Sequence, residues 1–283
     1  MNLRSLSLLS VLGYGAVSCL TATPQAHPSK ASSGDTAGTP PVPTVAWPNG
    51  ARAAVSLTYD DAIPSQLDNA VPALAQHGLV ATFFLTGSSE TLHAAPERYR
   101  ALLKAGHELG SHTMNHPCDR ALGFVKPGFG LQDYDLARME GELTESVQQL
   151  RDLGQSEPFS FAYPCGSTWL GQAHESYIPA VEKRFVAARG VNAGVAQADR
   201  YSLFEVPSAT GNVSGADLKT WVDRALFFHG WIVFTFHGVA GDYLSVQADA
   251  HEALLAYLEQ HKVDVWTERF GSVAQYVKAH GQR

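Results

Sequence analysis

The sequence predicts a single α/β domain, built as a distorted (β/α) barrel of about seven or eight strands. Short β-rich segments alternate with segments of helical periodicity, which is typical of a mainly parallel sheet. The chain has 283 residues, enough for one such barrel and a leader. Hydrophobic residues make up 45% and charged residues 17%, so a sizeable core can form. A doubly wound open sheet is the alternative, because periodicity does not show whether a sheet closes.

The expected strands are short runs rich in β-branched and aromatic residues. They are 53–59, 79–86, 107–111, 159–163, 185–188, 204–207, 231–236 and 263–267. Between them, apolar residues at helical spacing predict one helix that ends at Gly78 and a longer helix over 136–150 that ends at Gly154. Two later helices are expected to begin at Ser214 and Ser245, because a serine hydroxyl is a good N-cap.

The first 45 residues predict export and a tether. Residues 1–19 have the form of a signal peptide, in which Arg4 precedes an apolar run too short to span a bilayer. The small residues before Cys19 resemble a bacterial lipoprotein signal, whose cysteine carries the lipid. Ordinary cleavage nearby is the alternative, and it would leave a soluble periplasmic or secreted protein. Residues 20–45 are rich in Thr, Ser, Pro, Ala and Gly, so we expect a flexible linker before a domain over 46–283.

Charge and cysteine content exclude several classes of protein. The formal charge of −7 leaves no basic surplus for a phosphate backbone, so we expect no nucleic-acid partner. The three cysteines are Cys19, Cys118 and Cys165. They are too few for a disulfide-stapled scaffold and wrongly spaced for a cysteine-rich zinc site. The hydrophobic core must therefore hold the fold.

Titratable side chains follow two of the expected strands. Asp60 and Asp61 end the first strand, where one carboxylate could bind a cation while the other acts as a base. Capping of a strand end or helix is the alternative. His112 and His116 lie four residues apart after the third strand. A single helical turn would present both imidazoles to one ion, and a carboxylate from another strand would complete the set. Either histidine could instead be a hydrogen-bonded core residue.

Two further strand ends carry candidate groups. In the turn over 163–166, Pro164 and Gly166 shape a backbone whose N–H groups could hold an oxyanion. Simple turn formation is the alternative. His237 follows the apolar strand over 231–236 and is a candidate general acid. Its alternative role is to cap that strand.

These residues resemble the polysaccharide deacetylases of carbohydrate esterase family 4, also called the NodB-homology domain. The likeness runs over about 52–277, and the order and spacing of its motifs agree with that family. The matching sequences are Thr58-Tyr59-Asp60-Asp61, His112-Thr113-Met114-Asn115-His116, Phe161-Ala162-Tyr163-Pro164-Cys165-Gly166 and Phe236-His237.

The resemblance implies a role for each motif residue. Asp61, His112 and His116 would bind a divalent metal ion. Zinc is the first expectation, and cobalt, nickel, manganese and iron are alternatives for such a donor set. Asp60 would act as the general base and His237 as the general acid.

The third motif would supply the oxyanion and substrate contacts. Tyr163, Pro164 and the backbone N–H of Cys165 are the expected groups, by analogy with the family. Trp169 follows in a polar loop and is the best-placed aromatic residue to stack on a sugar ring. A place in the core is the alternative for its side chain.

Two departures from the family pattern lead to further hypotheses. Many members carry an arginine where Ala162 stands, and that arginine helps to fix the catalytic aspartate. Arg189, at the end of the strand over 185–188, could supply the missing guanidinium to Asp60; a surface charge is the alternative. Cys118 and Cys165 would lie in loops at the same rim, where a disulfide could form outside the cytoplasm. Two separate thiols are the alternative.

The expected function is a metal-dependent hydrolase that removes acetyl groups from a polysaccharide. The leading substrate is an N-acetylhexosamine glycan, such as a chitin-like polymer, an exopolysaccharide or peptidoglycan. An O-acetyl xylan esterase is one alternative, and an inactive glycan-binding module, motivated by Ala162, is another. We expect an exported monomer that is periplasmic, secreted or held at the cell envelope only by lipid on Cys19.

Overall fold

The computed structural model describes residues 45–197 and 200–281, all within the unit Val42–Arg283. The expected signal peptide over 1–19 and the linker before residue 45 lie outside the described residues. Within the described part, no helix is both long enough and apolar enough to cross a membrane.

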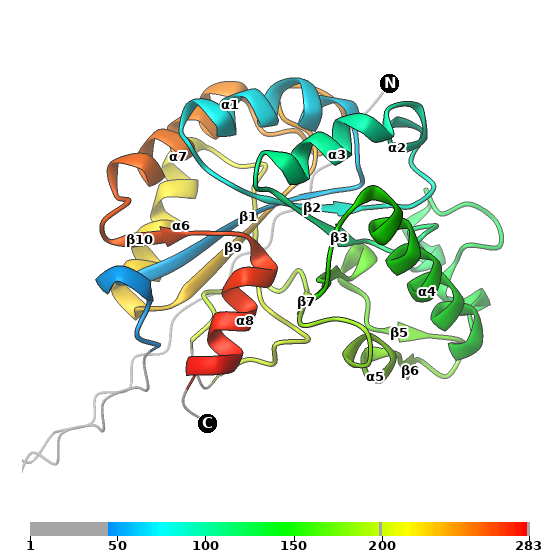
Figure 1. Ribbon diagram of the computed structural model, residues 1–283. Helices are drawn as coiled ribbons and strands as arrows, with labels where there is room; N and C mark the ends of the chain where they lie inside the picture. The colour runs from blue at the N-terminus through cyan, green and yellow to red at the C-terminus, as the bar shows by residue number, and fades with distance from the viewer. Residues whose placement is uncertain (1–44, 198–199, 282–283) are drawn as a thin grey trace, which may run out of the picture. The chain divides into compact units, whose positions relative to one another are not determined.

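A curled parallel sheet forms the centre of the domain (Figure 1). Its strands are β1 (Ala53–Asp60), β2 (Thr82–Leu85), β3 (Glu108–Ser111), β4 (Phe161–Ala162), β7 (Ala188–Arg189), β8 (Ala209–Thr210), β9 (Trp231–Phe236) and β10 (Val265–Thr267). The strand order is β7-β4-β3-β2-β1-β9-β8, and β10 pairs with β1 beside this path. Every pair in the sheet is parallel. A separate antiparallel pair joins β5 (Trp169–Leu170) to β6 (Glu175–Ser176).

The two ends of the strand order approach each other through the segment that leads into β8. The Ala188 N–H donates to the Leu203 carbonyl at 2.8 Å, and the Val206 N–H donates to the Ala188 carbonyl at 3.0 Å. Arg189 and Val206 also form a parallel bridge. The sheet is therefore a curled half-barrel, and the predicted α/β barrel class is confirmed.

Helices surround the sheet (Figure 1). They are α1 (Val71–Gln76), which continues a π-helix over Gln66–Ala70, then α2 (Glu90–Ala94), α3 (Pro96–Lys104), α4 (Leu136–Leu153), α5 (Ile178–Glu182), α6 (Gly215–Phe228), α7 (Ala248–Gln260) and α8 (Phe270–His280). Ser214 caps α6 as predicted, because its hydroxyl accepts from the Asp217 N–H at 3.2 Å. The predicted cap at Ser245 is wrong: its hydroxyl accepts instead from the Gly241 N–H at 3.0 Å, and α7 begins three residues later.

Burial explains which strands the sequence predicts well. All residues of β1 and β9 are buried, as expected for central strands covered on both faces, which read as nearly continuous apolar runs. The predicted range 231–236 therefore matches β9 at both ends. The predicted strands over 185–188 and 204–207 shrink to the short β7 and an isolated bridge at Val206.

The parallel register brings the polar residues to one edge. Carboxyl ends of parallel strands lie together, and in such folds the ligand site forms there. β1 ends at Asp60 and β7 at Arg189, while His112 directly follows β3 and His237 directly follows β9. Segments far apart in the sequence thus place their side chains around one site.

Candidate active site

Asp61, His112 and His116 form a cluster at this edge of the sheet. Asp61 Oδ1 lies 3.6 Å from His112 Nε2 and 3.4 Å from His116 Nε2. The backbone of Asp61 is left-handed, with φ of 80°, so the chain turns sharply as β1 ends. One ligand atom from each residue lies within 4.8 Å of the others. A carboxylate and two imidazoles that converge in this way are a donor set suited to zinc and related divalent ions.

The side chains around Asp61 favour its ionised form. Burial by itself would raise the pKa of Asp61, but the three neighbouring imidazoles, His112, His116 and His237, lower it below its ordinary value. The carboxylate is therefore ionised at neutral pH, which is the form that binds a cation.

The imidazole of His112 is oriented by the third motif. Its Nδ1 lies 2.8 Å from the Ala162 carbonyl oxygen. A carbonyl only accepts, so Nδ1 carries the proton and the Nε2 lone pair points toward Asp61. The Ala162 backbone thus has a role at the site even though its side chain lacks a functional group.

Asp60 lies beside the cluster, with its Oδ2 3.8 Å from His112 Nε2, but its closest partner is Arg189. Arg189 Nη2 donates to Asp60 Oδ2, and the two side chains are 0% and 4% exposed. Arg189 Nη1 also donates to the Thr235 hydroxyl on β9. Asp60 Oδ1 is buried and has no hydrogen-bond partner within the described part of the chain. The structure therefore places Arg189 where the sequence hypothesis put it, and one oxygen of Asp60 remains available.

His237 and Tyr243 lie on the other side of Asp61. His237 Nε2 is 3.7 Å from Asp61 Oδ2, and the Tyr243 hydroxyl donates to the same oxygen at 2.9 Å. Burial and the nearby Asp61 raise the pKa of Tyr243, so the hydroxyl stays protonated and acts as a donor. Asp61 thus presents Oδ1 to the histidine pair and Oδ2 to Tyr243 and His237.

The motifs did not identify Tyr243. It lies in an irregular loop after β9, where Asp242 and Leu244 both have positive φ. Such a loop has no periodic pattern, and the contact joins residues 182 positions apart. From the sequence, Tyr243 was only one of several aromatic residues that could stack on a sugar, and its contact with Asp61 was not expected.

Glu142 is a second group that the motifs did not identify. It is buried on α4, and its Oε2 accepts from the Met114 and Asn115 N–H groups, both at 2.9 Å. Its Oε1 accepts from Asn115 Nδ2 at 2.8 Å. These bonds hold the loop between His112 and His116 against the helix. In the sequence, nothing distinguishes Glu142 from the other polar residues of the predicted helix.

The side chains of Tyr163 and Pro164 differ from expectation. Both are buried, and Tyr163 packs edge-on against Phe161 and Tyr177. The expected substrate contacts from these two side chains are therefore not available, because the core needs their apolar surface. Cys165 lies next in the turn with φ of 52° and is bonded to Cys118 in a disulfide.

Trp169 has one face covered. Its ring is half-buried against the core and stacks on His174, with ring centroids 3.8 Å apart and planes within 9°. This stacking covers one face of the ring and holds it against the β5–β6 hairpin. A sugar could stack only on the other face, and the role of Trp169 as a sugar platform stays a prediction.

Comparison with known proteins shows a similarity to one family. A model of the polysaccharide deacetylase family matches residues 48–177, which contain Asp60, Asp61, the histidine pair and the third motif. Over this segment the chain is similar to the polysaccharide deacetylases. The family match stops before Arg189 and His237, which the fold brings to the same edge of the sheet.

Individual relatives share only parts of their length with this chain. A gellan lyase from Bacillus sp. is 26% identical over 81% of the chain and 10% of its own length. Peptidoglycan-N-acetylglucosamine deacetylase from Bacillus cereus is 35% identical over 27% of the chain and 36% of its own length. The chain spans between 10% and 56% of the length of the first curated relatives.

Solved structures share the fold. A Pseudomonas aeruginosa protein described as a "probable Polysaccharide deacetylase" has a TM-score of 0.62 at 15% identity, over 85% of this chain and 96% of its own. A family 4 carbohydrate esterase from Streptomyces lividans, in complex with acetate, has a TM-score of 0.50 at 19% identity, over 76% and 91%.

Removal of one hydroxyl tests the position of Tyr243. Tyr243→Phe takes away the donor to Asp61 Oδ2 but keeps the ring. We expect zinc affinity to fall by about 10-fold, because groups that orient metal-binding residues typically contribute 10–100-fold. Competition with a chromogenic chelator measures it. Tyr257→Phe is the matched control, since the Tyr257 hydroxyl on α7 donates to Asp223 on α6, away from the histidines. Equal zinc affinity in both variants would contradict the assignment.

Proposed function

We propose that this domain is a metal-dependent hydrolase that removes acetyl groups from an N-acetylhexosamine polysaccharide. One observation carries the proposal: the two adjacent carboxylates have different closest partners, although His112 Nε2 lies within 4 Å of both. Asp61 faces His112 and His116, whereas Asp60 is held by Arg189 and keeps Oδ1 free. Hydrolysis of an acetyl group needs both an electrophile and a base, and this arrangement offers a place for each.

Asp61, His112 and His116 would hold the divalent ion. Zinc is the ion we propose, and cobalt, nickel, manganese and iron suit the same donor set. When bound, the ion supplies Lewis-acid polarisation of the acetyl carbonyl and makes water more acidic. The protein's part is to fix these donors, through the Ala162 carbonyl behind His112 and the Tyr243 hydroxyl behind Asp61.

Asp60 and His237 would move the protons. Asp60 Oδ1 would accept a proton from the attacking water while Arg189 holds the other oxygen in place. His237 lies on the opposite side of Asp61, where it could donate a proton to the departing nitrogen as the C–N bond breaks. The new C–O bond yields acetate, and the sugar keeps a free amine. The backbone N–H of Cys165 is proposed to support the oxyanion.

The substrate class rests on the relatives. Two of them are a peptidoglycan-N-acetylglucosamine deacetylase and a chitooligosaccharide deacetylase, whose names both describe glycans of acetylated amino sugars. We propose the same amide chemistry here. We also propose action outside the cytoplasm, which the disulfide at the site supports because such bonds persist in oxidising compartments. Lipid attachment at Cys19 stays a prediction.

Acetate release from defined glycans tests this function. The purified protein is incubated with acetylated chito-oligosaccharides and with acetylated xylan, each with zinc or with a chelator. We expect acetate from the chito-oligosaccharides, loss of that activity with chelator, and recovery on adding zinc, because the reaction needs the bound ion. Acetate from xylan alone would replace the amide with an ester substrate. No acetate from either glycan by zinc-loaded protein would favour a glycan-binding module.

A conservative substitution tests the role of Arg189. Arg189→Lys keeps the positive charge, but a single ammonium cannot reproduce the fork that binds Asp60 and Thr235 together. We expect turnover to fall by about 100-fold, since a small misplacement of a reacting group typically has that effect. Zinc content should be unchanged. Arg98→Lys, at the exposed pair with Asp68, is the control. Wild-type turnover in Arg189→Lys would contradict the hypothesis that Arg189 positions Asp60.

A further inference from the structure

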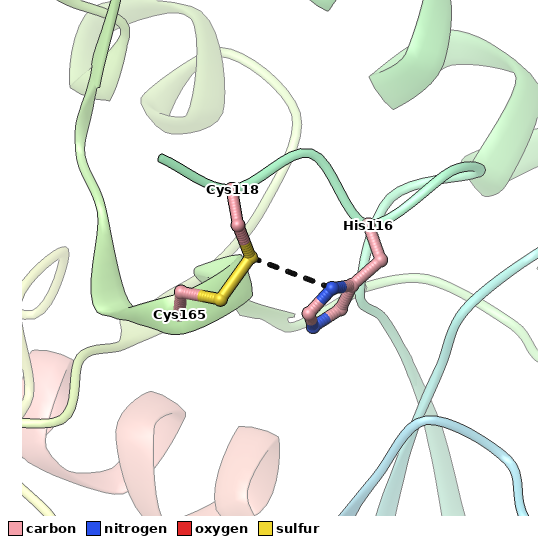
Figure 2. A group of neighbouring side chains, drawn as sticks. All are labelled: His116, Cys118 and Cys165. Atoms are coloured by element: carbon pink, nitrogen blue, oxygen red, sulfur yellow. Dashed lines mark hydrogen bonds between the residues drawn. A yellow bond between two sulfur atoms is a disulfide. The ribbon is translucent and has the colours of Figure 1, made fainter. Parts of the chain in front are cut away.

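The imidazole of His116 has an unusual partner. Its Nδ1 lies 3.5 Å from Cys118 Sγ, and that sulfur is bonded to Cys165 (Figure 2). A disulfide sulfur has no hydrogen, so it can only accept. The proton of this contact must therefore sit on His116 Nδ1, which leaves the Nε2 lone pair directed at Asp61.

The disulfide also joins the two loops that hold the histidines. Cys118 follows His116 by two residues in the loop after β3. Cys165 follows Ala162 by three residues in the turn after β4, and the Ala162 carbonyl accepts from His112 Nδ1. The bond spans 47 residues of sequence and Cα atoms 5.8 Å apart. Both imidazoles are thus oriented from one covalently linked pair of loops.

We propose that the Cys118–Cys165 disulfide is a positioning element of the metal site and makes divalent-metal binding sensitive to thiol reductants. The inference rests on the proposed metal site at Asp61, His112 and His116. It assigns the disulfide a function beyond stabilising the fold, because the sulfur fixes which nitrogen of His116 is free to bind metal.

Reduction of the Cys118–Cys165 disulfide breaks the link between the two loops and also changes the hydrogen bond between Cys118 Sγ and His116 Nδ1. A dithiol reductant supplies two electrons and two protons, is itself oxidised to a disulfide, and leaves two protein thiols. Cys118 then has an S–H that can donate to His116 Nδ1. That contact favours the tautomer with its proton on Nε2, the atom that faces Asp61. Metal binding must then displace this proton, so affinity falls.

Variants that lack both cysteines of the disulfide avoid a complication in the reduced protein. The sulfur atoms of Cys118 and Cys165 lie close to His116, so free thiolates could bind metal themselves. Cys118→Ala/Cys165→Ala removes the tether and the acceptor. Cys118→Ser/Cys165→Ala removes the tether and leaves a hydroxyl that, like the thiol of the reduced protein, can donate to Nδ1. Both lack the same cross-link, so urea unfolding should shift equally in the two.

Zinc affinity by chelator competition is the readout. We expect a loss of about 10–100-fold in Cys118→Ala/Cys165→Ala, the usual effect of losing a group that orients a ligand. The loss in the serine variant should be at least as large, because its hydroxyl can donate to Nδ1 as the reduced thiol would. Wild-type affinity in either variant would overturn the inference. If the wild-type protein itself bound no zinc, the proposed metal site would fail instead.

A measurement on the unaltered protein covers the case in which the variants do not fold. In metal-free wild-type protein, ¹⁵N NMR of the His116 ring reports which nitrogen carries the proton. We expect protonation at Nδ1 with the disulfide intact and a shift of the proton toward Nε2 after reduction. A proton on Nε2 in the oxidised protein would overturn the inference.

Discussion

The buried contact between Asp60 and Arg189 is the constraint around which the site is arranged. A buried charged pair depends on additional hydrogen bonds, and Thr235 on β9 accepts one from the guanidinium. Arg189 Nε and Asp60 Oδ1 have no hydrogen-bond partner within the described part of the chain. The ring of Phe84 lies 5.4 Å from the same group. Because β7 is not a neighbour of β1 in the sheet, this contact links two sides of the curled half-barrel.

The ion pair separates two carboxylates that are adjacent in sequence. Asp60 is turned toward Arg189, and the left-handed backbone of Asp61 directs the next carboxylate to the histidines. The groups that then fix each donor come largely from outside the motifs. Glu142 accepts hydrogen bonds from the loop between the histidines, and Tyr243 donates one to Asp61. The Cys118 sulfur of the disulfide contacts His116. Site precision therefore depends on contacts between distant segments.

The sequence predicted the parts that local chemistry determines. Continuous apolar residues marked β9, and helical spacing with a final glycine marked α4. The missing motif arginine at Ala162 led to Arg189, because a catalytic carboxylate needs an orienting partner. Tyr243 and Glu142 could not be predicted, since their contacts depend on loop paths and on packing across the fold. Trp169 had the right residue type, but only its stacking on His174 shows that one face is covered.

Asp60 is proposed as the base and Asp61 as a metal ligand. The substitutions Asp60→Asn and Asp61→Asn test this most directly, with zinc content and acetate release measured on the same samples. Asp60→Asn should retain one zinc ion per chain and lose turnover, because the base is gone while the donors remain. Asp61→Asn should lose both. Loss of zinc in Asp60→Asn, or zinc binding at wild-type affinity in Asp61→Asn, would contradict the assignment of Asp61 as the metal ligand and Asp60 as the base.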